Sequence, residues 1–600
     1  MGSMAQEKQP FALKDDPVEN FRPLKVRVIG AGYSGIYMGI RIPQRLRNVD
    51  FQIYEKNEGV GGTWWENRYP GAACDIPAHS YQYTFEPNPQ WSGFYAPSQE
   101  ICQYLQNVAD KYGVPRFVKF SHKVTSCIWD DLISKWQVHS LVTYGRSPLT
   151  LATNRRISVQ NLVTGEAFAE EADFVVSCRG NLNDFAWPDI AALESFKGEK
   201  MHSAAWNESY DFRNKKIGVI GGGSSSIQIV PILQKKEGAH LSCFVRSKVW
   251  ISNRFGDHVM HTLGLDPSRL DFTQEERDEF ANNPEKYLKF RKAIEEDGNM
   301  VHSSSLRGSE MQNMFVDMFG KSAKESLSKK PELLEYFHPT FGVGCRRLTP
   351  GPGYLEALVQ DNVDFISEKI GSITETGIQL ANGKHVDLDV LVCATGFNTS
   401  SIPPFALAGK NGVTLKEKFT PYPKTYLSMG VDDFPNYFIM LGPNSGIGAG
   451  TLTILLEAEG DYIIKCIRKI QKEDYLTITP KRARVEDFSE YVGEYFKKTI
   501  YMDECKSWYK SGGGYGDRIT ALWPGSILHA MEVLRAPRWE DFDYETREDN
   551  RLRWLGNGWS TNLLPGQGDP SWYLNAEEVD LPPAGTPEKD PKYHNRPFSH

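Results

Sequence analysis

The sequence has no closely spaced pair of cysteines and no group of metal-ligating side chains. Its nine cysteines form no CxxC or CxxxxC spacing. Their odd number and wide separation argue against a disulfide framework and for a reducing compartment. The histidines do not stand beside other ligand residues at zinc-binding intervals, so we expect no metal site. Redox chemistry based on a cysteine pair is therefore not favoured.

Long apolar runs and a strong net charge are also missing. No apolar stretch reaches the roughly 18 residues that a membrane-spanning helix needs, and the polar segment Met1–Pro10 lacks the apolar region of a secretory signal. A net charge of −8 over 600 residues argues against a general nucleic-acid binder. We therefore expect a cytoplasmic protein that spans no membrane and binds no nucleic acid.

A short apolar strand, a glycine-rich turn and a helix follow one another in LKVRVIGAGYSGIYMGIRI, residues 24–42. Gly30 allows the tight turn, Gly32 lets the backbone approach a pyrophosphate, and Gly35 permits close packing of the helix on the strand. The next strand, VDFQIYEK, carries Glu55 near its end, where a carboxylate accepts a hydrogen bond from a ribose hydroxyl. This arrangement predicts a dinucleotide site.

A second turn of the same kind occurs in KKIGVIGGGSSSIQIV, residues 215–230. Gly221, Gly223 and Ser226 occupy the three positions, and the serine departs from the usual glycine or alanine at the third. Serine is small, so it still allows the helix to pack on the strand. We place Ser224 and Ser225, at the start of the helix, among the cofactor-binding residues.

The strands that follow the two turns end in side chains of opposite charge. Arg246 stands 25 residues after the first glycine of the second turn, the same interval that leads to Glu55 in the first. An acid suits a free ribose hydroxyl, whereas Arg246, helped by Ser247 and Lys248, suits a 2′-phosphate. We therefore expect FAD at the first turn and NADPH at the second. The alternative is that the basic residues form only a solvated strand end.

Two such turns in one chain predict an α/β flavoprotein with two Rossmann-like dinucleotide-binding domains, for FAD and NADP, and a helical insertion. The strand segments at residues 172–180 and 388–397 resemble each other and are expected to lead the chain out of the FAD domain and back. Residues 140–166 are expected to form a strand hairpin. The predicted boundaries are 20–180 and 386–545 for the two parts of the FAD domain, 181–253 and 347–385 for those of the NADP domain, 254–346 for the insertion, and 546–600 for an extended tail.

Four further stretches resemble one family. FKGEKMHSAAW (Phe196–Trp206) has the spacing FxGxxxHxxxW, although Asn207 stands where Pro or Asp usually follows. The others are GGTWWENRYPGAACD (Gly61–Asp75), CRRLTPGPGYLEALVQDNV (Cys345–Val363) and CKSWYKSGGG (Cys505–Gly514). Together they resemble the type I Baeyer–Villiger monooxygenases. The sequences GCRRLTPGPGYLEAL and ALWPGS are more similar to the fungal and steroid-oxidising branches of that family.

The resemblance implies an enzyme that uses NADPH and O2 to insert one oxygen atom beside the carbonyl of a small-molecule ketone. A flavin C4a-peroxide attacks the ketone, and an ester or lactone forms. An anionic peroxide needs a fixed cation in a dry pocket. We also expect the chain to work as a monomer.

The same resemblance assigns roles to individual residues. Arg347 is the expected catalytic cation, and Asp75 is its counter-charge. Arg346 is expected at the NADP 2′-phosphate, and Trp508 is expected to close over the nicotinamide on a loop that moves about Ser511–Gly514. His202 and Trp206 are expected to hold the two cofactor domains in working relation, without acid or base chemistry. Further cofactor-binding residues are Thr63, Trp64, Asp75 and Val124.

Simpler interpretations remain open at this point. Arg346 and Arg347 could be a basic surface pair, Asp75 a turn residue and Trp508 a core residue. Two other reactions use a similar scaffold. One is N- or S-oxygenation by a flavin monooxygenase, against which Trp206 and the Asp75–Arg347 pair count. The other is an NADPH oxidase-like or redox-sensing flavoprotein, which needs no peroxide-stabilising arginine.

Overall fold

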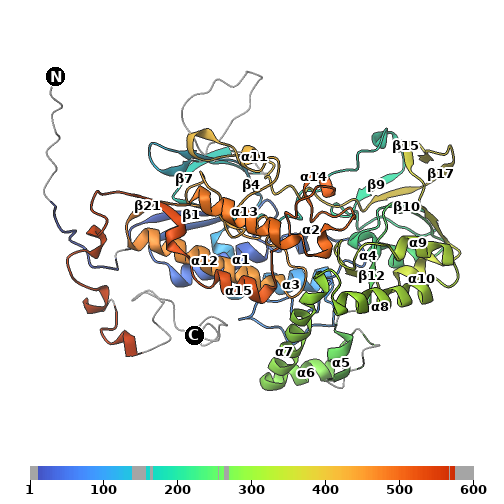
Figure 1. Cartoon of the computed structure of the whole chain (residues 1–600), viewed down its shortest axis with the longest axis horizontal. Coiled ribbons are helices and arrows are strands. Elements are labelled where there is room, and N and C mark those ends of the chain that lie inside the picture. Colours follow the sequence, from blue (N-terminus) through green and yellow to red (C-terminus); the bar gives the residue numbers. More distant parts are fainter. Residues whose placement is uncertain are drawn as a thin grey trace.

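The computed structural model describes residues 11–19, 21–137, 157–161, 167–253, 256–262, 266, 269, 271–566 and 568–574. Two parallel sheets, each with helices packed on it, lie on opposite sides of the described structure (Figure 1). Residues 140–156 and 162–166 of the expected hairpin lie outside the described residues, as does the end of the expected tail after residue 574. Each described helix is too short or too polar to cross a membrane.

The first sheet is parallel and has the strand order β20-β8-β1-β2-β3. Its central strand β1 is mostly apolar and almost wholly buried because helices pack on one face of the sheet and a smaller sheet, which carries Trp129 and Trp136, packs on the other. β1 lies between β2 and β8, so that Val26 is in register with Phe51 on one side and Phe174 on the other. The strands are β1 (Leu24–Ile29), β2 (Val49–Tyr54), β3 (Val118–Lys119), β8 (Phe174–Ser177) and β20 (Tyr437–Ile439).

Helices that are distant in the sequence cover this sheet together. α1 and α12 pack side by side (Figure 1). Every residue of α1 from Tyr33 to Ile42 is buried, which explains why this helix is apolar around most of its circumference. The helices of the first domain, including those that do not touch the sheet, are α1 (Tyr33–Arg45), α2 (Thr63–Glu66), α3 (Ser98–Lys111), α11 (Leu415–Lys418), α12 (Leu452–Lys472), α13 (Arg482–Phe496), α14 (Ser511–Gly514) and α15 (Ile527–Leu534).

The second sheet is also parallel and has the order β14-β11-β10-β18-β9. β18 pairs with β10 and β9, so residues 390–393 belong to this sheet, and the boundary predicted at 385/386 is too early. The error arose because β8 and β18 both end in a small-residue turn, although they lie in different sheets. The elements are β9 (Glu199–His202), β10 (Lys216–Ile220), α4 (Ser224–Gln234), β11 (His240–Phe244), α10 (Tyr354–Leu358), β14 (Val363–Ile366) and β18 (Val390–Cys393).

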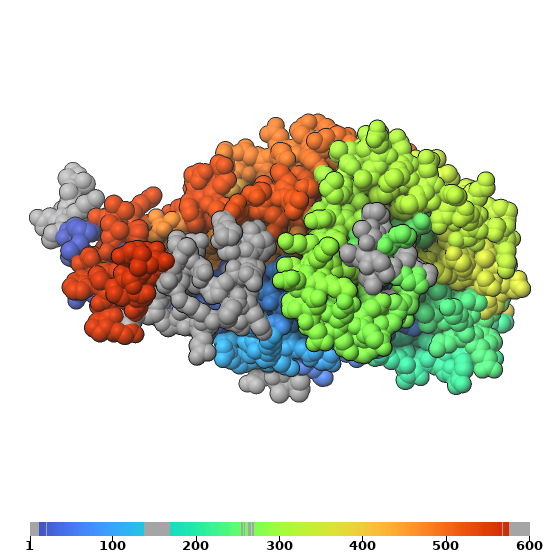
Figure 2. Space-filling model, turned by 90° about the horizontal axis from the view of Figure 1, so that it is seen from below, coloured from blue at the N-terminus to red at the C-terminus, as the bar shows by residue number. Residues whose placement is uncertain are grey.

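The segment between the two parts of the second domain is helical, as its charged, periodic sequence predicted. A capping box between Thr273 and Glu276 starts α6, and Pro284 follows the Asn283 cap of α7. Figure 2 shows this insertion as one block beside the blue part of the chain. Its helices are α5 (Asp257–Thr262), α6 (Gln274–Asn282), α7 (Pro284–Met300), α8 (Glu310–Ser326) and α9 (Leu334–Phe337).

An aromatic box anchors the insertion on the first domain. The buried ring of His79 lies edge-on to three phenylalanines, one before α6 and one each on α6 and α7, with ring centroids 5.1 to 5.6 Å away. Its Nδ1 is 2.9 Å from the Tyr287 hydroxyl. α8 and α9 instead contribute to the core of the second sheet through residues such as Ala323 and Phe337. The insertion therefore bridges the two domains.

Smaller sheets complete the chain. An antiparallel set, joined by one parallel strand, extends the first domain in the order β19-β4-β5-β7-β6. The remaining strands are β4 (His122–Asp130), β5 (Lys135–Gln137), β6 (Ile157–Asn161), β7 (Ala167–Ala172), β12 (Ile251–Ser252), β13 (Thr349–Pro350), β15 (Ile370–Thr374), β16 (Gly377–Leu380), β17 (His385–Asp387), β19 (Ala406–Ala408), β21 (Tyr475–Pro480) and β22 (Phe542–Thr546). Short 3-10 helices lie at Val114–Phe117, Leu193–Ser195, Val301–Ser305, Pro331–Leu333, Lys410–Gly412, Ile500–Met502, Trp539–Asp541, Arg553–Leu555, Thr561–Leu563 and Trp572–Leu574.

Candidate active site

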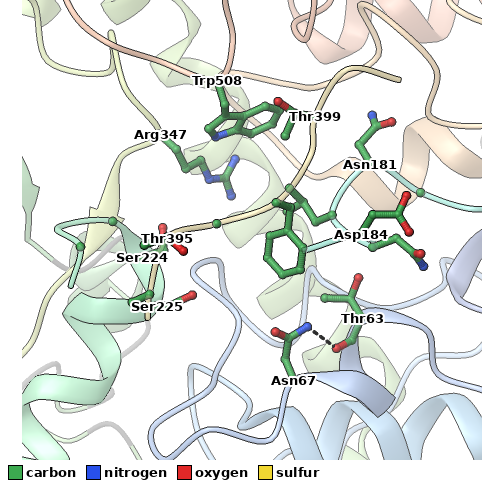
Figure 3. Close-up of a pocket in the computed structure, with 18 of the residues that line it drawn as sticks. Thr63, Asn67, Asn181, Asp184, Ser224, Ser225, Arg347, Thr395, Thr399 and Trp508 are labelled. Atoms are coloured by element: carbon green, nitrogen blue, oxygen red, sulfur yellow. Dashed lines mark hydrogen bonds between the residues drawn. The ribbon is translucent and has the colours of Figure 1, made fainter. Parts of the chain in front are cut away.

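Both glycine-rich turns open onto one cavity of about 1210 Å³ that is lined from both parallel sheets (Figure 3). The cavity gathers almost all the predicted site residues. Those in its wall are Gly30, Gly32, Glu55, Thr63, Trp64, Asp75, Val124, Gly221, Gly223, Ser224, Ser225, Arg246, Ser247, Arg346, Arg347 and Trp508. Gly35 lies behind the wall in α1, where a Cβ would stand 1.9 Å from the Gly30 carbonyl oxygen. Its place is in the packing of helix on strand.

The first turn points the N-terminal end of α1 at the cavity. Gly30 has φ +101°, and a Cβ there would stand 2.7 Å from the Cys178 carbonyl oxygen, so a side chain does not fit. Glu55 braces the turn, because its carboxylate accepts hydrogen bonds from the Ala31 N–H (2.7 Å) and the Asn57 N–H (2.9 Å). Burial raises the pKa of Glu55, and these two donors oppose that shift. A carboxylate has about four acceptor sites, which leaves capacity for a hydroxyl group in the cavity.

The second turn is built in the same way and is more open. Gly221 has φ +131°, and a Cβ there would stand 2.3 Å from the Ala394 carbonyl oxygen. A Cβ on Gly223 would meet no atom within 4 Å, so the backbone at the start of α4 faces free space. The Ser224 hydroxyl is hydrogen-bonded to that of Thr349 at 2.6 Å. This N-terminus of α4 is therefore accessible to an anion.

Two arginines line the cavity next to the second turn. Arg246 is exposed at the end of β11, and Arg346 donates from Nη1 to the Lys248 carbonyl oxygen at 2.7 Å. The Lys248 ammonium does not line the cavity and is 3.2 Å from the Glu335 carboxylate. The prediction that Lys248 assists Arg246 is therefore wrong. Sequence proximity suggested it, but in the folded chain the Lys248 ammonium pairs with the carboxylate of Glu335, which lies 87 residues further along the sequence.

Arg347 and Asp75 form a bidentate ion pair in the cavity wall. The Arg347 Nε donates to Asp75 Oδ2 at 2.9 Å, and Nη2 donates to Oδ1 at 2.7 Å. The Arg347 side chain keeps 38% of its surface accessible, and this surface faces the cavity. The nearby Asp75 carboxylate raises the pKa of Arg347 well above its ordinary value, and burial opposes this. The guanidinium therefore stays charged and leaves donors free toward the cavity.

Contacts between the domains bring Asp75 to Arg347. The Tyr69 hydroxyl donates to Gln228 Oε1 on α4 at 2.8 Å, and Gln228 Nε2 donates to the Ala73 carbonyl oxygen at 3.0 Å. Gly71 has φ +83°, and a Cβ there would stand 2.5 Å from the Gln228 carbonyl oxygen. The motif that carries Asp75 thus docks directly on a helix of the second domain.

His202 lies where the two segments that connect the domains meet. Its ring stacks on Phe185 from the first connection at 4.6 Å and lies edge-on to Phe397 from the second at 6.4 Å. The Ala204 N–H donates to Nδ1 at 3.1 Å, and Nε2 is 3.3 Å from the Thr395 hydroxyl. Burial lowers the pKa of His202 to about 4, so the ring is neutral near pH 7. This environment is structural, and His202 does not line the cavity.

Trp206 has a different place from the one expected. It stacks on Phe212, with ring centroids 5.5 Å apart, at the edge of the core of the second domain. It contacts the domain interior, whereas His202 contacts the connections.

Trp508 lies on a loop at the mouth of the cavity and is 36% exposed. Its indole meets the ring of Tyr509 edge-on at 4.7 Å, and Tyr509 is almost fully buried. The loop closes on itself, since the Ser507 N–H donates to the Gly514 carbonyl oxygen at 3.1 Å. Gly512 and Gly513 have φ of +60° and +68°, a conformation that glycine adopts without strain. Residues 506–516 are called the lid below.

A disulfide bond joins Cys345 to Cys505, which corrects the expectation of a chain without disulfides. The two cysteines are 160 residues apart in the sequence, and their Cα atoms are 6.4 Å apart. Sequence spacing could not reveal this pair, because two separate motifs have to meet in the fold before the sulfurs are close. The other seven cysteines are free, and six of them are buried.

The sequence did not point to several polar residues in the wall of the cavity. They lie on the segments that follow β8, β18 and α2 (Figure 3). A general signal existed for most of them, since ligands of open α/β sheets bind at the carboxyl ends of the strands. These residues are Asn67, Asn181, Asp184, Thr395 and Thr399.

Comparisons with known proteins agree with this geometry. Residues 28–97 match a family described as an NAD(P)-binding Rossmann-like domain. The FAD-binding monooxygenase tazF of Aspergillus terreus is 36% identical to this chain over 92% of this chain and 95% of its own. A Baeyer–Villiger monooxygenase of Pseudomonas aeruginosa is 30% identical over 86% of this chain and 90% of its own. The chain belongs to the Baeyer–Villiger monooxygenases.

Family membership confirms the predicted enzyme class, a flavin-dependent monooxygenase, and the predicted fold. Among solved structures, an oxidised steroid monooxygenase bound to NADP has a TM-score of 0.70 and is 26% identical. The likeness covers 87% of this chain and 99% of that one. The two parallel sheets described above are thus those of a Baeyer–Villiger monooxygenase.

Proposed function

We propose that this Baeyer–Villiger monooxygenase uses FAD at the first turn and NADPH at the second to convert a ketone into an ester or lactone. The observation that carries the proposal is the Arg347–Asp75 pair, a permanent cation held by two hydrogen bonds in the wall shared by both nucleotide turns. N- or S-oxygenation and simple NADPH oxidation do not need such a cation.

The described residues at the first turn fit FAD. Gly32 and Gly62 bring two backbone segments together, since a Cβ on Gly32 would stand 3.5 Å from the Gly62 Cα. The flat backbone surface suits the close approach of a pyrophosphate to the start of α1. Glu55 lies in the same wall with acceptor capacity for a ribose hydroxyl.

The second turn fits NADPH. The open space in front of Gly223 accommodates a pyrophosphate at the start of α4. Arg246 and Arg346 line the cavity on the side of the second sheet, where their guanidinium groups suit a 2′-phosphate. A nucleotide without that phosphate would leave this charge unpaired, so we propose that NADPH is preferred to NADH.

When bound, the flavin supplies the reduction and activation of O2. The chain supplies charge and position. Arg347 places its free N–H donors in the cavity, where they stabilise negative charge on oxygen, including that on the former carbonyl oxygen of the ketone. Asp75 keeps the guanidinium oriented, and the Trp508 lid limits access of water to this charge.

We further propose that the chain acts as a monomer in the cytoplasm. All the residues assigned above belong to a single chain, so the cavity needs no second subunit to complete it.

The proposal is tested by product analysis with purified enzyme, NADPH and separate ketone, amine and thioether panels. We expect ester or lactone from the ketones. Arg347→Ala should retain bound FAD but lose ester formation by about 100-fold or more, since one preorganised oxyanion donor is worth that much. N-oxide or sulfoxide without ester, or an unimpaired Arg347→Ala enzyme, would overturn the proposal.

A further inference from the structure

The Cys345–Cys505 disulfide joins the two segments that carry the cation and the lid. Cys345 precedes Arg347 by two residues, and Cys505 precedes Trp508 by three. We propose that this disulfide is a positioning staple for the lid, and that its reduction loosens the lid over Arg347. The inference rests on the proposed function for the role of Arg347, but its first readouts concern the lid itself.

The base of the lid is held at the staple and by one charged residue. The Asp503 carboxylate accepts hydrogen bonds from the Gly342 N–H at 2.8 Å and from the Arg307 Nε at 3.0 Å. Both sulfurs are shielded, since Cys345 is 0% and Cys505 is 7% exposed. Residues 503–505 are therefore fixed to the segment before Arg347 by one covalent bond and the Gly342 contact, and to Arg307 by a second polar contact.

Beyond the staple, the described part of the lid has weaker attachments. Most of its backbone hydrogen bonds are internal, such as those from Gly516 to Ser511 and from Ser507 to Gly514. A Cβ on Gly512 or Gly513 would meet no atom within 4 Å, so nothing packs closely on this turn. The far side of the lid is tied to the segment that follows it, since the Thr520 N–H donates to the Tyr509 carbonyl oxygen and the Ser511 N–H donates to the Arg518 carbonyl oxygen, each at 2.8 Å. Trp508 lies between these contacts and the staple, so loss of the fixed base would be transmitted to Trp508 from one side.

The remaining cysteines do not offer a competing effect of reduction. They are already thiols, and most lie in apolar cores where burial raises the pKa, as for Cys127, Cys243 and Cys466. A reductant that reaches the described cysteines changes the covalent structure at one place. Neither Cys345 nor Cys505 lines the cavity, so the staple does not receive electrons by direct contact with a flavin there.

The chemical step is a thiol–disulfide exchange. A dithiol transfers two electrons and two protons to the Cys345–Cys505 bond, so that the S–S bond breaks, two thiols form, and the dithiol becomes a cyclic disulfide. Because both sulfurs are shielded, this exchange requires the base of the lid to open. Reduction should therefore be slow in the closed state and faster when the lid opens.

The first experiment compares the oxidised protein with the protein reduced by dithiothreitol under native conditions. Alkylation and mass spectrometry count the thiols, brief proteolysis measures cleavage within residues 506–516, and titration measures the affinity for NADP⁺. We expect reduction to accelerate cleavage of the lid and to weaken NADP⁺ by roughly 5-fold or more, the size of a typical coupling between sites. The ester formed per NADPH should fall more than the rate of NADPH oxidation.

Variants separate the staple from general stability. Cys345→Ser and Cys505→Ser should each reproduce the reduced protein and no longer respond to dithiothreitol. Cys466→Ala, in a buried core away from the lid, is the matched control and should keep the response. If the serine variants do not fold, the reduced wild-type protein still gives the result.

Three outcomes overturn the inference. They are two free thiols at Cys345 and Cys505 in air-oxidised protein, unchanged lid cleavage after verified reduction, or unchanged NADP⁺ affinity. If lid cleavage and NADP⁺ affinity respond but no ketone gives ester in either redox state, the staple stands and the proposed function fails.

Discussion

Replacing Asp75 by Asn tests the central feature of the site. The change keeps the size of the side chain and removes the charge that holds Arg347 through hydrogen bonds of 2.9 and 2.7 Å. Two unit charges 4 Å apart attract by about 4 kcal/mol at an effective dielectric constant of 20. The Arg347 side chain is 38% accessible, so water in the cavity offsets part of this loss. We expect the free energy of unfolding to fall by only about 1–2 kcal/mol.

The effect on catalysis should be larger than the effect on stability. Without its carboxylate partner, the guanidinium adopts several orientations, and a displacement of about 1 Å in a catalytic group can cost about 100-fold in rate. We expect Asp75→Asn to lower the rate of ester formation by about 100-fold while NADPH oxidation continues. Hydrogen peroxide should account for most of the NADPH consumed. Gas chromatography of the ester and a peroxide assay measure both quantities in one reaction.

Asp461→Asn is the matched control. Asp461 also forms a bidentate pair, with Arg45 at 2.7 and 3.1 Å, but it lies between α1 and α12 and does not line the cavity. Its loss should reduce stability by a similar or larger amount and leave the ester formed per NADPH unchanged. If Asp75→Asn retained more than about a third of the wild-type ester rate, the argument that Asp75 orients Arg347 would be refuted.

Three further predictions concern the domain contact, the cofactor and pH. Gly71→Ala places a Cβ 2.5 Å from the Gln228 carbonyl oxygen at φ +83°, so it should lower the free energy of unfolding, measured in urea, by about 2 kcal/mol or more. Gly383→Ala, at φ +89° with open space around it, should lower it by less, and equal losses for the two variants would contradict the contact at Gly71. Arg246→Ala should raise the KM for NADPH by about tenfold and leave that for NADH nearly unchanged in initial-rate assays; an equal rise for both would place Arg246 elsewhere. The pKa of His202 falls from 6.5 to about 4 on folding, so between these pH values the unfolded chain binds a proton that the folded protein does not, and the free energy of unfolding should decrease as pH falls from 6.5 toward 4. His202→Asn should flatten this part of the curve, and an unchanged slope would show that the ring has the same pKa in the folded and the unfolded protein.

The sequence predicted those features that depend on local backbone chemistry. The glycines of the two turns, the alternation of strand and helix, and the helical insertion follow from short stretches whose pattern admits few conformations. Gly30 and Gly221 both adopt a positive φ, and at each a carbonyl oxygen lies too close to the position of a Cβ for any other residue to fit. This requirement for glycine makes the motif recognisable in the sequence.

Features that depend on long-range contacts could not be predicted in the same way. The assignment of β18 to the second sheet, the pairing of Lys248 with Glu335, and the Cys345–Cys505 bond each depend on segments that meet only in the folded chain. The Arg347–Asp75 pair was predicted because the family resemblance supplied the missing contact. Periodicity and spacing alone did not predict it.

The paired connections between the domains have a mechanical consequence. Phe185 and Phe397 form an antiparallel backbone bridge, and the Asn398 N–H donates to the Asp184 carbonyl oxygen at 2.7 Å, so the two connections make a narrow two-stranded ribbon. Such a ribbon bends readily across its face and resists shear within its plane. The second domain should therefore rotate along an arc about this ribbon as a hinge, and it cannot rotate freely in other directions. Every point of the nucleotide site on that domain would follow a fixed path past the first glycine-rich turn, and the distance from the ribbon would set how far each point travels.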